Sequence, residues 1–304
     1  MHIFITGASG LIGSALIATL LKQGGHHITA LTRNKAKMEQ KWSTRIAYCP
    51  SLGQISSLTG YDAVINLAGE PIIGKRWNNA QKEKLCNSRW NITRRLTELI
   101  EKSDSPPHVF ISGSAVGYYG AQGNQTVDEN TPGEDEFTHR LCKEWEALAL
   151  EAQSAKTRVC ISRTGIVMSK EGGMLSMLTL PFHLGLGCSL GKGSQYISWI
   201  HIQDMVNALI FLMDTPEAKG IFNLTAPNPV TNKRFSKLLS ATLYRPCLFR
   251  IPSFAIKLAL GEAATMLLDG QRVMPQRLLD LHFRFSYEHL DSALAGLLKG
   301  KKKR

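Results

Sequence analysis

The sequence predicts an α/β fold in which a doubly wound parallel sheet is followed by a smaller, mainly helical carboxyl-terminal lobe. Two observations predict it. Short apolar runs alternate with stretches of helical periodicity over the first half of the chain, and a glycine-rich turn joins the first run to the first helix. The chain has 304 residues, of which 43% are hydrophobic and 20% charged, so it can bury a large core and is neither disordered nor fibrous.

The first half of the chain consists of strands that alternate with helices. We expect strands at residues 2–6, 27–32, 63–68, 109–112 and 158–163, and helices at 11–22, 77–101 and 138–153. The strands are short apolar runs, whereas the helices repeat apolar residues every three or four positions. Because each helix carries the chain back to begin another parallel strand, the sheet must be covered on both faces.

The second half is less regular. Glycines at 172–173 and 185–193 predict loops around a ligand, and we expect a helix at 206–213, a strand at 221–224 and helices at 232–243 and 256–268. This pattern predicts a sheet domain at 1–168 with returning elements near 205–225, a lobe at 169–298 that includes a terminal module at 250–298, and a basic tail at 299–304. The lobe should cover the carboxyl ends of the strands, where open α/β sheets bind ligands.

The net charge of +12 is concentrated at the end of the chain. Five of the last six residues are basic, which leaves +7 for the rest. A basic end is usually a solvated tail, and a body of this charge suits a phosphorylated ligand. No zinc-finger spacing, RNP-type segment or helix-turn-helix signal accompanies the charge, so we expect no nucleic-acid partner; an adaptor that works through the tail is a distant alternative.

Neither a membrane span nor a metal site is expected. No run of about 20 apolar residues could cross a bilayer. The six cysteines are scattered without a CxxC pair or a metal-ligand spacing, which indicates free thiols in a reducing compartment, the cytoplasm. We expect a cytoplasmic monomer or homodimer that acts on a small-molecule substrate and has no membrane partner.

The strongest functional signal is the turn Gly7-Ala8-Ser9-Gly10-Leu11-Ile12-Gly13 between the first strand and the first helix. The first glycine permits a tight turn, the second lets the backbone approach a pyrophosphate, and the third lets the helix pack closely on the strand. Free N–H groups at the start of the helix would then meet the phosphate charge. We expect a dinucleotide to be bound by Gly7, Ser9, Gly10, Leu11, Ile12 and Gly13.

The end of the second strand indicates which dinucleotide is bound. An NAD site has an Asp or Glu about 20 residues after the turn, which binds the ribose 2′-hydroxyl. Here Thr32-Arg33 stands at the end of the strand, followed by Asn34, Lys35 and Lys37. A guanidinium can hold a 2′-phosphate with two hydrogen bonds, whereas a carboxylate would repel it. We therefore expect NADP(H), bound through Thr32 and Arg33; the alternative is a solvated basic loop.

Together these features resemble the extended short-chain dehydrogenase/reductase superfamily, and more closely its sugar-nucleotide epimerase-like group of epimerase family proteins. The resemblance extends from Met1 to about Leu298. The matching segments are TGASGLIG (6–13), NLAGEPI (66–72), RWN (76–78), SAVGYYG (114–120), WEALA (145–149), RTGIV (163–167), WIHIQD (199–204), PNPVTN (227–232) and LLDGQRVMPQRL (267–278). The last segment is typical of the group's carboxyl-terminal module. The resemblance implies a Rossmann fold that binds NADP(H), and a substrate that is generally unassigned.

The resemblance also implies further cofactor contacts. Leu67 and Ala68 end a strand where such proteins pass their backbone beneath the adenine and ribose, and Val167 corresponds to the backbone that meets the nicotinamide amide. Glu83 and Arg89 lie six residues apart on the long helix and could face the nucleotide. The alternative for these two residues is a solvated ion pair.

The catalytic residues depart from the superfamily pattern. Short-chain dehydrogenases use Ser, Tyr and Lys, with Tyr and Lys one helical turn apart so that Lys lowers the pKa of the phenol. Ser114 stands where the Ser belongs. The register in which Glu146 follows the Lys by four positions, however, places Thr138 and Cys142 at the Tyr and Lys positions. A register shifted by one residue gives the pair His139 and Lys143 instead.

Two phenols lie close to Ser114 in the sequence, Tyr118 and Tyr119. Either could supply a proton, so Ser114, Tyr118 and Tyr119 are the catalytic candidates; packing is the alternative role of the tyrosines. The sequence therefore predicts an NADP-dependent oxidoreductase or epimerase that acts on a small polar substrate such as a nucleotide-linked sugar. The competing hypothesis is a non-catalytic NADP(H)-binding redox sensor or assembly protein that has lost the Tyr/Lys pair.

Overall fold

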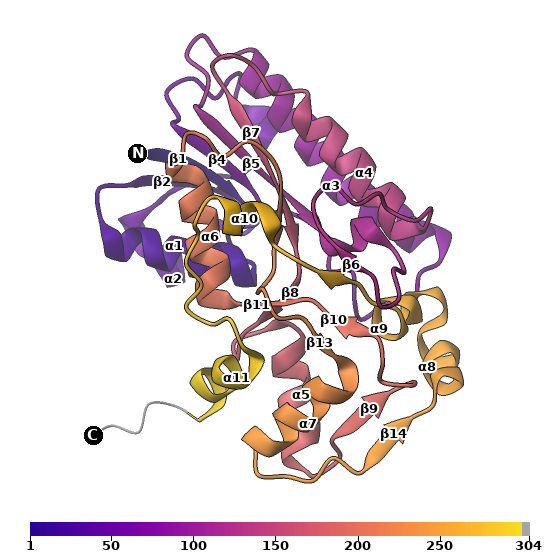
Figure 1. Ribbon diagram of the computed structural model, residues 1–304. Coiled ribbons are helices and arrows are strands. Elements are labelled where there is room, and N and C mark those ends of the chain that lie inside the picture. Colours follow the sequence, from indigo (N-terminus) through magenta and orange to yellow (C-terminus); the bar gives the residue numbers. More distant parts are fainter. Residues whose placement is uncertain (300–304) are drawn as a thin grey trace, which may run out of the picture.

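The computed structural model describes residues 1–299, and its centre is a sheet of seven strands (Figure 1). Every adjacent pair in the order β12-β7-β5-β4-β1-β2-β3 runs parallel. The strands are β1 (His2–Thr6), β2 (His27–Leu31), β3 (Ala47–Cys49), β4 (Ala63–Asn66), β5 (Val109–Ala115), β7 (Arg158–Thr164) and β12 (Gly220–Leu224). The chain crosses to either side of β1, which is a doubly wound arrangement, so the predicted fold class is confirmed.

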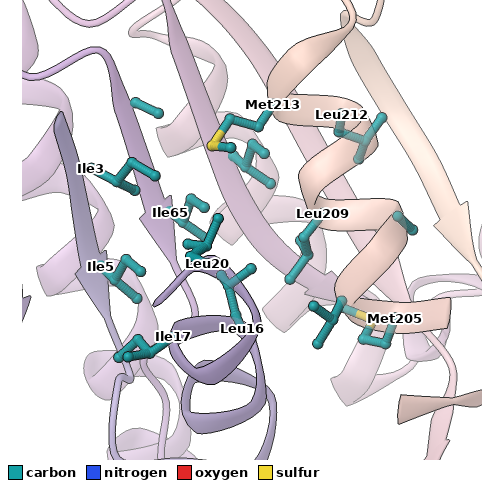
Figure 2. Close-up of a cluster of buried hydrophobic side chains, with 14 of the residues drawn as sticks. Ile3, Ile5, Leu16, Ile17, Leu20, Ile65, Met205, Leu209, Leu212 and Met213 are labelled. Atoms are coloured by element: carbon teal, nitrogen blue, oxygen red, sulfur yellow. The ribbon is translucent and has the colours of Figure 1, made fainter. Parts of the chain in front are cut away.

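Helices cover both faces of the sheet because its strands are apolar on both sides. One face carries α1 (Leu11–Gln23) and α6 (Ile202–Asp214), and the other carries α3 (Asn79–Glu101) and α4 (Phe137–Leu150). Figure 2 shows the first layer, where Ile3 and Ile5 of β1 share a buried cluster with Leu16 of α1 and Leu209 of α6. Phe4, between them in sequence, is buried in the cluster on the opposite face.

The lobe at the carboxyl ends of the strands has its own core around Trp199 and Phe235. Its helices are α5 (Gly173–His183), α7 (Asn232–Thr242), α8 (Ser253–Leu260), α9 (Thr265–Leu268) and α11 (Leu290–Leu298). Its paired strands are β8 (Ile166–Met168) with β11 (Trp199–His201), β9 (Cys188–Leu190) with β14 (Phe249–Ile251), and β10 (Tyr196–Ile197) with β13 (Val230–Thr231). Within residues 1–299, no helix is both long and apolar enough to cross a membrane.

The end of the chain returns to the sheet. After α9 the chain forms β15 (Arg272–Val273), which pairs in parallel with β6 (Thr126–Val127), and α10 (Gln276–Asp280), which packs against β12. The terminal module is thus tied both to the lobe and to the edge of the sheet, as Figure 1 shows for α9, β6 and α10.

The expected elements are present with ends that differ by a few residues, and the exceptions have local causes. The helix expected at 256–268 is two helices, because Gly261, with φ of +61°, ends α8 and a 3₁₀ turn (Gly261–Ala264) precedes α9. Gly172 and Gly173 were expected in a loop, but Gly173 is the first residue of α5 and Gly172 is its N-cap. The basic segment after Arg33 is also helical, as α2 (Lys35–Trp42). Most of the basic tail lies outside the described residues.

Candidate functional site

A cavity of about 500 Å³ opens at the carboxyl ends of β1, β4, β5 and β7, where an open α/β sheet binds ligands. Nine of the residues predicted from the sequence line it, namely Gly7, Gly10, Leu11, Ile12, Gly13, Leu67, Arg89, Ser114 and Val167. Seven lie outside the lining, namely Ser9, Thr32, Arg33, Ala68, Glu83, Tyr118 and Tyr119. The structure therefore brings the phosphate turn, Val167 and Ser114 into one space.

Close backbone contacts require glycine at two positions of the phosphate turn. Gly7 has φ of +66°, and a Cβ atom on it would lie 2.4 Å from the carbonyl oxygen of Leu67. A Cβ atom on Gly13 would lie 2.4 Å from the carbonyl oxygen of Gly7, so α1 packs directly on the turn. Gly10 is the N-cap of α1 and has no capping side chain, which leaves the first N–H groups of the helix for an anion.

A buried hydroxyl on β1 fixes the end of β4. Oγ1 of Thr6 donates to Oδ1 of Asn66 at 2.6 Å and accepts the N–H groups of Leu67 and Ala68, both at 3.2 Å. The Asn66 amide donates in turn to Oγ1 of Thr93 on α3, at 2.9 Å. The backbone at Leu67 is therefore held at the floor of the cavity by side chains from two neighbouring elements.

Thr32 and Arg33 lie between β2 and the start of α2. Thr32 is buried, and its Oγ1 accepts the N–H group of Asn34 at 3.2 Å, whereas Arg33 is exposed. Oδ1 of Asn34 caps α2 by accepting the N–H group of Lys37 at 3.0 Å. Arg33 comes one residue before the N-cap of α2, and in the described part of the chain it forms no salt bridge.

Arg89 of α3 lines the cavity, but Glu83 on the same helix is exposed. The Arg89 guanidinium donates to the carbonyl oxygens of Leu85 at 2.9 Å and Glu70 at 3.0 Å, and lies 5.3 Å from the centre of the Trp145 ring. Burial lowers the pKa of Arg89, although an arginine remains a cation at neutral pH. Among the described residues no ion pair joins Glu83 to Arg89, so the two residues have separate surroundings.

Ser114 is the end of a buried polar network. Its Oγ donates to Oε1 of Glu146 at 2.6 Å, and Arg163 on β7 donates to both oxygens of that carboxylate, each at 2.8 Å. Burial lowers the pKa of Arg163, but its hydrogen bonds to Glu146 and the charge of that residue outweigh burial and raise it overall. Since Ser114 gives its hydrogen to a carboxylate in a buried ion pair, its hydroxyl is fixed by the fold.

Both candidate tyrosines contact Arg163. The Tyr119 hydroxyl accepts from Arg163 at 3.1 Å and donates to Oδ1 of Asn223 at 2.7 Å. Tyr119 is fully buried, and burial raises its pKa to about 12. The centre of the Tyr118 ring lies 3.3 Å from the central carbon of the Arg163 guanidinium. Both tyrosines therefore contact the Arg163 guanidinium, and neither of them lines the cavity.

Helix α4 faces the cavity in the register set by Glu146. Thr138 and Cys142 line the cavity one turn apart, and they are the residues for which the resemblance led us to expect Tyr and Lys. Burial raises the pKa of the Cys142 thiol to about 11, so it is neutral at pH 7. Of the shifted pair, His139 is buried outside the lining and Lys143 is exposed. The cavity thus has neither a phenol nor an ammonium group at these positions.

Sequence reasoning missed the apolar part of the lining. Pro71, Ile72 and Ile73 come from the loop after β4, and Met266 and Leu267 come from α9. Two of the matching motifs, NLAGEPI and LLDGQRVMPQRL, contain some of these residues and could have signalled a site. Nothing in the sequence pattern shows, however, that segments so far apart in the chain meet.

The lining is suited to a dinucleotide. The phosphate turn offers N–H groups with no side chain on Gly10 to exclude a pyrophosphate. The buried indole N–H of Trp145, a lining residue, has no acceptor in the described part of the chain, so a ligand oxygen could accept its hydrogen. Residues 1–299 contain no group of three His, Cys, Asp or Glu side chains arranged to hold a metal ion.

The chain belongs to the NAD dependent epimerase/dehydratase family, whose model matches residues 3–225. A second model, described as a domain of unknown function (DUF1731), matches residues 251–297. The first match covers the sheet up to β12, and the second covers the terminal module. The family resemblance inferred from the motifs is therefore confirmed.

Several named relatives match over nearly the whole chain. The chain is 38% identical over 305 residues to the epimerase family protein SDR39U1 homolog, chloroplastic, of Arabidopsis thaliana, which is 98% of this chain and 87% of that protein. It is 34% identical over 304 residues to the epimerase family protein YfhF of Bacillus subtilis, 99% of each.

Solved structures extend these similarities to three dimensions. The crystal structure of human epimerase family protein SDR39U1 (isoform 2) with NADPH has a TM-score of 0.91 at 32% identity, covering 99% of this chain and 100% of that one. UDP-glucuronic acid 4-epimerase from Bacillus cereus, in complex with UDP-glucuronic acid and NAD, has a TM-score of 0.76 at 17% identity, covering 98% of each chain. The second similarity shows a shared fold alone.

Proposed function

We propose that this chain is an NADP(H)-dependent oxidoreductase. The observation that carries the proposal is a single cavity that joins the phosphate turn to Ser114, whose hydroxyl is anchored on the buried Glu146–Arg163 pair. The nicotinamide, when bound, supplies the hydride chemistry, so the protein has to orient a substrate beside it with groups fixed by packing. The NADPH in the human relative, at 32% identity, supports the choice of cofactor.

In this proposal the preference for NADP(H) over NAD(H) comes from Arg33. Arg33 is exposed, precedes the N-cap of α2, and can form charge-assisted hydrogen bonds with a 2′-phosphate. Thr32 orders the backbone beside it. Ser9 and Ala68 adjoin lining residues in the sequence, and we retain both as proposed cofactor contacts; the exposed Glu83 gains no support from the geometry.

We assign different roles to the three catalytic candidates. Ser114 lines the cavity and is the residue that contacts the substrate. Tyr118 and Tyr119 contact Arg163 and act as positioning residues, because Arg163 holds Glu146 and Glu146 holds Ser114. An epimerase would also need a base for a substrate hydroxyl, which the neutral thiol of the α4 face does not provide, so we favour an oxidoreductase.

A non-catalytic NADP(H)-binding sensor is the second candidate, and the observation that favours it is the pair Thr138 and Cys142 in place of Tyr and Lys. The two functions differ in what happens to bound NADPH. We expect a single turnover with at least one member of a panel of quinones, small aldehydes and sugar nucleotides. Ser114→Ala should slow that turnover by about 10²-fold, whereas Lys143→Ala should not change it. Tight NADPH binding without oxidation by any panel member would support the sensor.

The cytoplasm is the compartment we propose. All six cysteines are free thiols in the structure, four of them buried. Unpaired cysteines persist in compartments whose thiol buffers keep them reduced.

A further inference from the structure

Apart from the phosphate turn, the cavity is walled mainly by apolar side chains. The loop after β4 contributes Pro71, Ile72 and Ile73, and α9 contributes Met266 and Leu267. We call this set of five residues the apolar wall. It lines the same cavity as Ser114.

Contacts outside the cavity hold both segments of the apolar wall in place. The indole N–H of Trp77 donates to the carbonyl oxygen of Ile72 at 3.1 Å, and the Trp77 ring packs edge-on against Phe137 of α4 with ring centres 5.2 Å apart. On the other side, Nζ of Lys82 on α3 lies 2.5 Å from Oε2 of Glu262, in the turn that precedes α9. Both segments of the wall are therefore tied to the helices that carry the site.

The wall offers nothing to neutralise a charged substrate. In the described chain, Arg89 is the one charged side chain of the lining, and its guanidinium already donates to the carbonyl oxygens of Leu85 and Glu70. A carboxylate or diphosphate placed against the wall would lose its hydration there, and none of the five wall residues could pair with its charge. The part of the substrate held here is therefore uncharged, in contrast to the polar, nucleotide-linked substrate expected from the sequence.

The groups in the cavity that could donate a proton narrow the class of substrate further. The hydroxyl and thiol residues that line it are Ser114, Thr138, Cys142 and Thr164. Ser114 gives its hydrogen to Glu146, and none of the four is an acid poised near neutral pH. Reduction of a simple ketone produces a strongly basic alkoxide and calls for such an acid. Reduction of a quinone produces a phenolate, whose pKa is about 10 like that of tyrosine, so water can protonate it.

We infer that the substrate of this site is an uncharged quinone, an inference that rests on the proposed NADP(H)-dependent reduction. In this inference a flat, conjugated ring lies against the apolar wall, and a hydroxyl that reduction forms on the ring can donate to Oγ of Ser114, whose own hydrogen is given to Glu146. Reduction converts both C=O groups to C–OH and consumes a hydride, supplied by the nicotinamide when it is bound, and one proton from water, which leaves hydroxide. No residue of the chain is oxidised or consumed.

Binding of duroquinone to the full chain tests the inference without measuring turnover. Its fully substituted ring cannot alkylate thiols, and a quinone should quench the fluorescence of Trp145 in the lining and Trp77 behind it. We expect saturable quenching that Ile73→Asp weakens about tenfold, because the variant puts a charge into the apolar wall. Ile73 is 44% exposed, so the variant should fold, and Leu258→Asp, at a residue 77% exposed on α8 outside the lining, is the matched control.

The outcomes separate the substrate class from the proposed function. Duroquinone binding that Ile73→Asp weakens and Leu258→Asp does not supports the inference. Equal binding by both variants and wild type, or no binding while UDP-glucose binds, would overturn the quinone assignment and leave the proposed function intact, provided that NADPH still binds. A chain that does not bind NADPH, measured by fluorescence of the reduced nicotinamide, would refute the proposed function and the reduction of a quinone with it.

Discussion

Replacement of Arg33 by alanine should weaken NADPH binding and leave NADH binding nearly unchanged. In the described structure the Arg33 side chain is exposed and forms no salt bridge, so its loss removes no internal ion pair and should not alter folding. The effect of Arg33→Ala is therefore confined to the cofactor. Only NADPH carries the 2′-phosphate that the guanidinium would bind.

The size of the effect follows from the type of bond. Hydrogen bonds to a charged group contribute about 1.5–3 kcal/mol, which is about ten- to a hundredfold in Kd. Because Arg33 is exposed and solvent screens its charge, we expect the lower part of this range. Addition of salt should reduce the preference for NADPH in the wild type and have little effect in the variant.

Calorimetric titration with NADPH and NADH, each at low and high salt, measures this difference. Lys143→Ala serves as the control, since Lys143 is an exposed cation on α4 that does not line the cavity. Equal affinities of the wild type for the two cofactors would refute the assignment of Arg33, as would a similar loss of NADPH and NADH affinity in Arg33→Ala.

Three further predictions concern the turn and the buried network. Gly10→Asp should remain folded but lose NADPH binding in the same titration, because its carboxylate would stand where the pyrophosphate approaches. Glu146→Gln should lower the free energy of unfolding by about 3–5 kcal/mol, measured by urea denaturation, because it leaves Arg163 buried without its partner; a smaller loss would argue against the ion pair. Tyr119 has a pKa of about 12 when folded and about 10 when unfolded, so the stability from its protonated form is full below pH 10 and declines as the pH rises toward 12. Tyr119→Phe should flatten the fall in unfolding free energy over that interval, and an equally steep fall would contradict the prediction.

The phosphate turn could be predicted from the sequence because its constraints are local. Gly7, Gly10 and Gly13 lie within one strand–turn–helix unit, and their spacing alone indicates where the backbone turns and where the helix begins. The structure adds one long-range constraint, since a side chain on Gly7 would collide with the backbone of Leu67 at the end of β4. The alternation of strands and helices predicted the parallel sheet for the same local reason.

The roles of the tyrosines could not be predicted because they depend on distant partners. Tyr119 bonds to Asn223, which lies 104 residues further along the chain. In the sequence Tyr119 is simply the phenol close to Ser114, and only the packing of β12 beside β7 shows that its hydroxyl is engaged. The apolar wall could not be predicted for the same reason. Ile73 and Met266 line one cavity only because the terminal module packs against distant parts of the chain.

The arrangement around Glu146 explains how the site can stay ordered without the Tyr/Lys pair. Glu146 connects Ser114 to Arg163 and needs neither Thr138 nor Cys142 for its hydrogen bonds. The absence of a phenol and an ammonium group from these positions therefore leaves the Ser114 hydroxyl in place. In the proposed function such a site would orient an acceptor beside a nicotinamide and would favour acceptors whose reduced product is a weak base. The apolar wall, built from different elements, offers no partner to a charged group, and the quinone that we propose is uncharged and meets both conditions.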